Sequence, residues 1–328
     1  MKGDRLDRRS FLGLGVGALG VAAAPGWLRP EERLVRLTVP VMGTVAEMAV
    51  PARHEGMARQ ALQAAAAELR RVERLMTRFT ATSDVGRFNA AAPGARVPVS
   101  PETAEVVREA LAWARRSGGA FDPTLERLTA AWDPMTHHTP PSEELLRSAA
   151  ADARGWASLE LASAPGASEA WLVRSPGASL DLGGIAKGYG VDQAVRVLRE
   201  HGIHRGLVNV GGDLMAMGDG PGGRPWRVGI RDPRSPEGLL DTVEVVEGAV
   251  ATSGDYLRYF DHGGRRYHHI LDPRTGAPAQ SGMRTVTVLA ADVTTADASA
   301  TLAFTSGLEE TGRILLSSSR RARIIHSG

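Results

Sequence analysis

The stretch from Ser179 to Asp192, which reads S-L-D-L-G-G-I-A-K-G-Y-G-V-D, constrains the fold more than any other. A short apolar run meets a glycine pair, and apolar residues at helical spacing follow, which predicts a strand, a tight turn and a helix start. Gly183 and Gly184 let a ligand approach the backbone, while Lys187 and the unpaired N–H groups of the first helical turn suit a phosphate. The spacing is not that of a P-loop, because Gly188 follows the lysine in place of Ser or Thr. A solvated surface turn therefore remains the alternative.

The composition is that of an ordinary globular protein. The chain has 328 residues, of which 43% are hydrophobic and 23% are charged, enough for a large core in one domain or two closely joined ones. The 39 basic and 37 acidic residues nearly balance and only 5% of residues are aromatic, so nucleic acid is not expected as a partner. Cysteine is absent, which excludes disulfides, thiol nucleophiles and Cys-ligated metals. Any covalent catalysis must therefore use oxygen or nitrogen.

Residues 1–30 are expected to be an export signal followed by a linker. Arg8 and Arg9 precede an apolar run, rich in glycine and alanine, from Gly13 to Ala24, a pattern typical of twin-arginine signals. The run is too short to span a bilayer comfortably. A chance arginine pair before an apolar segment is the alternative. The sequence therefore predicts an exported protein, periplasmic or otherwise extracytoplasmic, with one domain over residues 31–328.

The first part of that domain predicts a strand pair and two long helices. Residues 34–50 are expected to form two strands that turn around Met42 and Gly43. Met42 is either a flat apolar wall for a ring system or plain core filler. A helix rich in Ala, Leu, Glu and Arg is predicted from Gly56 to Met76. A second helix, with apolar residues at helical spacing, is predicted from Pro101 to Arg116.

Asp122 lies in an extended segment, A-F-D-P-T, which the following proline keeps out of the helical region. Its carboxylate can accept hydrogen bonds from the N–H edge of a ligand. It can equally cap the helix that follows. The sequence leaves both roles open.

The second half of the chain is rich in strands and hairpins. A strand over 206–210 leads into a second glycine pair, Gly211 and Gly212, and further strands are predicted over 226–230 and 242–246. These hairpins favour an α+β fold over a doubly wound one. His269 precedes the turn sequence Asp-Pro-x-Thr-Gly, and a structural histidine with satisfied hydrogen bonds is the alternative to a functional one.

The last motif carries metal chemistry. Thr294 and Asp297 are spaced as a capping pair, which predicts a helix start there. Asp297 and Thr301 are four residues apart and so share one helical face. A carboxylate and a hydroxyl on one face form part of a shell for Mg²⁺, which prefers oxygen ligands. An acidic residue placed favourably near the positive end of the helix is the alternative.

Together these motifs resemble the ApbE family of FAD:protein FMN transferases. They occur in the family's order and cover roughly residues 38 to 310. They read V-M-G-T at 41–44, A-F-D-P-T at 120–124, D-L-G-G-I-A-K-G-Y-G-V-D at 181–192, N-V-G-G-D at 209–213, A-T-S-G at 251–254, H-H-I-L-D-P-R-T-G at 268–276 and T-A-D-A-S-A-T at 295–301.

The resemblance implies an α+β fold with mixed or antiparallel sheets and flanking helices, and it implies a set of site residues. It places Mg²⁺ on Asp297, Thr301 and the backbone oxygen of Gly184. It places His269 and Asp272 near the phosphates as catalytic residues, with His269 as base or proton shuttle. The residues that it places around FAD are Met42, Phe79, Ala120, Phe121, Asp122, Asp181, Lys187 and Leu271.

The activity implied is Mg²⁺-dependent transfer of FMN from FAD, the substrate, to a threonine hydroxyl of an acceptor protein, with AMP leaving. An acceptor such as a subunit of a membrane redox complex brings the enzyme close to a membrane. Hydrolysis of FAD to FMN and AMP and FAD binding without turnover are the alternatives. Two features depart from many relatives: Phe79 stands where a tyrosine or a polar residue is frequent, and the lipidation cysteine is absent.

Overall fold

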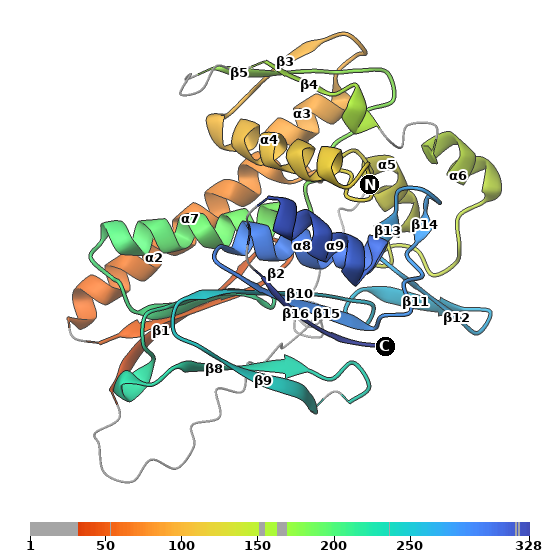
Figure 1. The fold of residues 1–328 in the computed structure, drawn as a ribbon. Helices are drawn as coiled ribbons and strands as arrows, with labels where there is room; N and C mark the ends of the chain where they lie inside the picture. The colour runs from red at the N-terminus through yellow and green to blue at the C-terminus, as the bar shows by residue number, and fades with distance from the viewer. Residues whose placement is uncertain are drawn as a thin grey trace, which may run out of the picture.

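The protein is built around one seven-stranded sheet (Figure 1). The computed structural model describes residues 32–52, 54–150, 155–162, 169–235, 237–318, 320 and 322–328, so the predicted export signal lies outside the described residues. The strand order is β1-β2-β6-β7-β10-β15-β16, and each of these neighbouring pairs is antiparallel. The strands are β1 Leu34–Val41, β2 Thr44–Pro51, β6 Gly206–Val210, β7 Asp213–Met217, β10 Gly248–Gly254, β15 Thr285–Ala290 and β16 Arg323–Ser327.

Two tight turns join strands of this sheet at positions that the sequence indicated. Met42 and Gly43 connect β1 to β2 with φ values of 53° and 66°, as a two-residue hairpin turn of the primed kind requires. The N–H of Met42 donates to the Oε1 atom of Glu73 at 2.8 Å, which fixes this unusual backbone. Gly211 and Gly212, with φ of 61° and 103°, connect β6 to β7 in the same way. The strand pair predicted over residues 34–50 is confirmed.

Three helices cover one face of the sheet, and a two-stranded ribbon covers the other (Figure 1). The helices are α2 Glu55–Met76, α7 Ala186–Glu200 and α8 Val293–Ser306, and their apolar sides form the largest core with the strands. The ribbon consists of β8 Trp226–Arg231 and β9 Leu239–Val245. Strands β6 and β7 are buried at every residue because they are covered on both faces.

Two smaller clusters complete the fold. The first contains α3 Asp84–Ala90, α4 Pro101–Arg116, α9 Leu308–Ser317 and the sheet β3 Arg96–Val99, β5 Ala170–Val173 and β4 Glu160–Ala162. The second contains α5 Glu126–Trp132, α6 Glu143–Ala150, β11 Tyr259–His262, β12 Arg265–His268, β13 Leu271–Asp272 and β14 Ala277–Pro278. Short 3₁₀ turns lie at Gly155–Ala157 and Pro221–Gly223. The α+β prediction is confirmed, and among the described residues no helix is long and apolar enough to cross a membrane.

The predicted strand before the glycine pair is wrong. Ser179 forms only an isolated bridge to Leu125, and residues 180–182 belong to no strand. The side chain of Asn89 takes the place of a neighbouring strand. It accepts from the N–H of Leu180 at 2.7 Å and donates to its carbonyl at 2.9 Å, so both backbone groups are satisfied.

The predicted cap of α8 is also wrong by two residues. Asp292, not Thr294, is the N-cap, and its carboxylate accepts from the N–H of Thr295 at 2.7 Å. Asp192, at the other end of the central stretch, accepts from the N–H groups of Val293 and Thr294 at 2.9 Å each. A carboxylate from α7 therefore caps α8, which joins the two helices that carry the predicted site.

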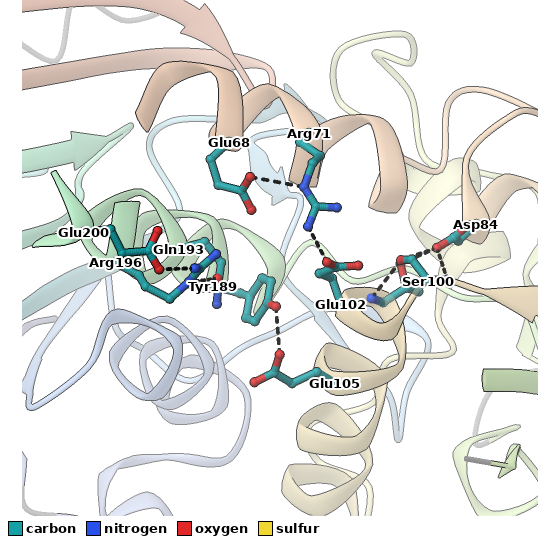
Figure 2. A network of polar contacts seen from close by, with 11 residues as sticks. Glu68, Arg71, Asp84, Ser100, Glu102, Glu105, Tyr189, Gln193, Arg196 and Glu200 are labelled. Carbon is teal, nitrogen blue, oxygen red and sulfur yellow. Dashed lines mark hydrogen bonds and ion pairs between the residues drawn. The ribbon is translucent and has the colours of Figure 1, made fainter. Parts of the chain in front are cut away.

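Polar contacts join α4 to α7 and to α2 (Figure 2). The hydroxyl of Tyr189 on α7 donates to Glu105 of α4 at 2.8 Å. Arg71 of α2 binds Glu68 and also reaches Glu102 of α4. These contacts hold the start of α7 in a fixed position relative to the smaller helical cluster.

Candidate active site

The glycine-rich turn packs directly on α8. A Cβ atom on Gly184 would lie 3.2 Å from Cγ2 of Thr301 and 3.3 Å from Cε2 of Phe121. A Cβ atom on Gly188 would lie 2.5 Å from the carbonyl oxygen of Val293, closer than real Cβ atoms come. Position 188 therefore requires glycine for this close approach, whereas a Cβ at position 184 would make tight contacts with side chains that can shift. Two segments more than a hundred residues apart in the sequence thus form one site.

The predicted metal ligands are brought together here. Asp297 is 5% exposed, and its Oδ2 atom accepts from the N–H of Gly188 at 2.9 Å. Its carboxylate therefore lies at the N-terminus of α7 as well as in the second turn of α8. Within the described residues, no hydrogen-bond donor reaches Oδ1 of Asp297 or the hydroxyl of Thr301, and Gly184 lies against that hydroxyl. Oδ1 of Asp297 and the hydroxyl oxygen of Thr301 are thus available to bind a metal ion.

This donor set fits Mg²⁺. Mg²⁺ is usually bound through one or two carboxylates, with waters and substrate phosphates completing the octahedron. Among the described residues, no group of three or more His, Asp or Glu side chains could hold a metal. The described side chains therefore do not form a complete metal shell by themselves. A single carboxylate, a hydroxyl and a backbone oxygen match a cation shared with a phosphorylated ligand. The ligand set stays a prediction.

Lys187 stands between two buried carboxylates. Its ammonium group contacts Oδ2 of Asp213 and lies 4.0 Å from Oδ2 of Asp297. Asp213 is 1% exposed, and its Oδ1 atom accepts from the N–H of Thr252 at 3.3 Å. Burial lowers the pKa of Lys187, the charge of Asp297 opposes that shift, and the nearby Arg258 adds to it. Sequence reasoning missed Asp213 as a site residue, although its position directly after the second glycine pair was a signal.

The two adjacent histidines have different roles. His268 is buried, with Nε2 3.0 Å from the carbonyl of Ala279 and Nδ1 accepting from the N–H of Ile270, so both ring nitrogens are used. His269 is half-buried, and its Nδ1 atom lies 3.3 Å from the carbonyl of Arg258. Burial and the positive charges around it, first that of Arg258, lower the pKa of His269 to about 3. His268 is therefore a structural residue and His269 is neutral at pH 7, while the catalytic role of His269 stays a prediction.

Asp272 is engaged in a turn. Both of its carboxylate oxygens accept from Arg274, at 2.9 Å and 2.8 Å, and its backbone oxygen accepts from the N–H of Gly276 at 2.9 Å. Arg274 also donates to the carbonyl of Thr305 at the end of α8, at 3.1 Å. Because Arg274 occupies both carboxylate oxygens, Asp272 holds this turn in position against the end of α8. Its predicted catalytic role stays a prediction.

Several of the predicted FAD-site residues lie at the same junction. Met42 contacts α7 closely enough that a Cβ on Gly190 would lie 2.5 Å from its methyl carbon. Phe121 is buried against Gly184, and the carbonyl of Ala120 accepts from the hydroxyl of Thr305 at 3.0 Å. Met42, Phe121 and Ala120 are therefore anchored to α7 and α8.

Asp181 and Phe79 are joined by one arginine. The Oδ1 atom of Asp181 accepts from the N–H of Gly183 at 2.8 Å, and its Oδ2 atom lies 3.5 Å from Nε of Arg78. The guanidinium of Arg78 lies 4.3 Å from the ring centroid of Phe79, which is 74% exposed. An exposed ring supported by a fixed cation can stack on a planar ligand.

The remaining two predicted residues are packed inward. The Oδ1 atom of Asp122 accepts from the N–H of Thr124 at 2.8 Å, so this carboxylate stabilises the turn before α5. Leu271 is 5% exposed and packs in the core that also contains Trp132 and Phe260. For these two residues, a contact with FAD stays a prediction.

Comparison with known proteins agrees with this arrangement. The ApbE protein of Thermotoga maritima superposes with a TM-score of 0.79 at 32% identity, covering 90% of this chain and 94% of that one. The flavinyl transferase ApbE of Pseudomonas stutzeri, in its apo form, gives 0.77 at 30% identity, covering 91% and 92%. The fold thus belongs to the structural class of ApbE proteins.

Sequence relatives make the assignment specific. The ApbE family model matches residues 42–325, and the chain therefore belongs to the ApbE family. An FAD:protein FMN transferase of Rhodobacter capsulatus is 37% identical over 320 residues, which is 95% of this chain and 59% of that protein. One of Klebsiella pneumoniae is 31% identical over 88% of this chain and 83% of its own length. The chain spans less than two thirds of the Rhodobacter relative.

Proposed function

We propose that this protein is an FAD:protein FMN transferase that moves FMN from FAD to a threonine hydroxyl of an acceptor protein. The observation that carries the proposal is the junction of α7 and α8. At this junction the glycine-rich turn lies next to Lys187 and to the carboxylate of Asp297. Such a site offers positive charge and metal-binding oxygens, which together suit a diphosphate. The N–H groups of Gly183 and Gly188, which the sequence suggested for phosphate binding, are instead bonded to Asp181 and Asp297.

The residues of the chain bind and orient FAD. Gly183 and Gly184 leave the backbone open to the diphosphate, and Lys187 supplies a positive charge beside it. Arg258 adds a second cation close to Lys187. The exposed ring of Phe79, which lies against the arginine that contacts Asp181, offers a stacking surface for a flavin or adenine ring. These contacts fix the bond between the two phosphates of FAD relative to the incoming hydroxyl.

The reaction is a phosphoryl transfer with a simple balance. The threonine oxygen forms a bond to the FMN phosphorus, the bond from that phosphorus to the oxygen of AMP breaks, and the hydroxyl proton leaves. Mg²⁺ bound at Asp297, Thr301 and Gly184 would neutralise the charge that develops on the phosphates. His269 accepts the hydroxyl proton at Nε2, which has no hydrogen-bond partner among the described residues. A bound diphosphate offsets the cations that depress the pKa of His269, and this makes the imidazole a stronger base.

The test incubates the full chain with FAD, Mg²⁺ and an acceptor protein carrying a target threonine. We expect AMP release and covalent flavin on the acceptor in equal amounts, with both abolished by a chelator. AMP release that is independent of the acceptor would instead indicate hydrolysis of FAD by water. FAD binding without AMP release would indicate a binding protein. Either outcome would overturn the proposal.

We also propose that the protein acts outside the cytoplasm on a membrane-associated acceptor. The support is the sequence of residues 1–30, with the arginine pair Arg8 and Arg9 ahead of an apolar run. Replacing both arginines with lysine should retain the folded protein in the cytoplasm. Unchanged export of that variant would contradict a twin-arginine route.

A further inference from the structure

Asp213 has no assigned role, yet it makes the closest contact of the site lysine. Its carboxylate is 1% exposed and faces the ammonium of Lys187. Asp213 begins β7 immediately after the turn formed by Gly211 and Gly212, so a rigid central strand holds the carboxylate in place. A hydrogen bond at 3.3 Å from the N–H of Thr252 on β10 fixes its other oxygen.

The position of the ammonium between the two carboxylates is asymmetric. Lys187 is in contact with Asp213 but stays 4.0 Å from Asp297. The Oδ2 atom of Asp297, on the side of the lysine, is already occupied by the N–H of Gly188 at 2.9 Å. Oδ1 therefore remains open on a carboxylate that would otherwise form a direct ion pair with the lysine. A lysine paired with Asp297 would compete with a divalent cation for the same charge.

We propose that Asp213 is a positioning residue that holds the Lys187 ammonium away from Asp297 and so keeps that carboxylate free for a divalent cation. The inference rests on the proposed function, because it concerns the same metal site. With the ammonium held by Asp213, one positive charge remains beside the diphosphate, and the metal ligand keeps its negative charge. The two cations, lysine and metal, then act on the substrate without competing.

The test measures metal binding to the full chain at a saturating concentration of ADP, whose diphosphate supplies the phosphate ligands but carries no FMN to transfer, so it does not depend on turnover. Mn²⁺ prefers the same oxygen ligands as Mg²⁺, and its free fraction can be followed by electron paramagnetic resonance. In D213N the lysine loses its anionic partner and moves onto Asp297. We expect Mn²⁺ affinity to fall roughly tenfold, the effect of closing an ion pair from about 4 Å to hydrogen-bond contact at an effective dielectric near 20.

A double variant separates this effect from simple damage to the fold. In K187Q no ammonium competes, so Mn²⁺ should bind at least as tightly as in the wild type. K187Q/D213N should match K187Q, because Asp213 acts through the lysine alone. D84N is the matched control: Asp84 is equally buried, but it binds Ser100 and Thr103 in the helical cluster, and its loss should leave Mn²⁺ affinity unchanged.

The outcomes are distinguishable. A wild-type chain that binds no Mn²⁺ would refute the metal site of the proposed function, and with it any need for Asp213 to protect that site. Wild-type binding with equal affinity in D213N would refute the positioning role alone. If D213N does not fold, D213S takes its place in the comparison with the wild type. If K187Q/D213N bound Mn²⁺ tenfold more weakly than K187Q, Asp213 would act on the metal by a route other than Lys187, and the proposal would be refuted.

Discussion

Replacing Gly188 with alanine should destabilise the protein at the junction of α7 and α8. The new Cβ would lie 2.5 Å from the carbonyl oxygen of Val293 and 2.9 Å from Cβ of Asp297. Because the first of these atoms belongs to the backbone, it cannot turn aside, and overpacking of this kind costs about 3 kcal/mol at its upper range. Alanine returns about 1 kcal/mol through its better helix propensity. The net loss is therefore about 2 kcal/mol in the free energy of unfolding.

Differential scanning calorimetry of the full chain measures this loss. At about 2–4 °C per kcal/mol for a large domain, G188A should melt about 4–8 °C below the wild type. The matched control is Gly312→Ala in α9, where nothing lies within 4 Å of the added Cβ, so only the propensity gain remains and the melting temperature should rise. A G188A variant that melts at or above the wild-type temperature would refute the close packing of the two helices.

Three further predictions concern the surroundings of the site. Asn89→Ala removes both hydrogen bonds to Leu180, so the free energy of unfolding, measured by chemical denaturation, should fall by about 1–3 kcal/mol and FAD binding should weaken. Unchanged stability and FAD affinity would show that Asn89 does not hold the segment before the glycine pair. Tyr189→Phe should cost about 1 kcal/mol by the loss of one hydrogen bond, and an unaltered unfolding midpoint would contradict the network in Figure 2. His268 and His269 both have lowered pKa values in the folded protein, so below pH 6.5 the unfolded chain binds more protons than the folded chain. The free energy of unfolding should therefore fall as the pH drops from about 6.5 toward 3. A stability that does not change with pH in this window would contradict the prediction.

Features encoded within a short segment were predictable from the sequence. The turn at Met42 and Gly43 and the helix Pro101–Arg116 occur where glycine, proline and apolar spacing place them. The serine cap of α3 is equally local, because Ser83 accepts from the N–H of Gly86 three residues on. Each of these depends on residues a few positions apart, so the local pattern carries the information.

Features that depend on distant residues were not predictable in this way. The apolar run before Gly183 looks like a strand, but the side chain of Asn89 satisfies its backbone from a different element. The start of α8 is fixed partly by Asp192, a hundred residues earlier. The contact between Lys187 and Asp213 joins two motifs whose proximity only the fold reveals. A single sequence shows both partners in each case and gives no sign that they meet.

The most direct test of the metal and diphosphate site is an anomalous difference map from a crystal of the protein grown with FAD and Mn²⁺. We expect one strong peak at about 2 Å from a carboxylate oxygen of Asp297, the hydroxyl of Thr301 and the carbonyl of Gly184, in contact with both phosphates of FAD. A cation bound elsewhere on the phosphates, with Asp297 still paired only to the N–H of Gly188, would contradict it.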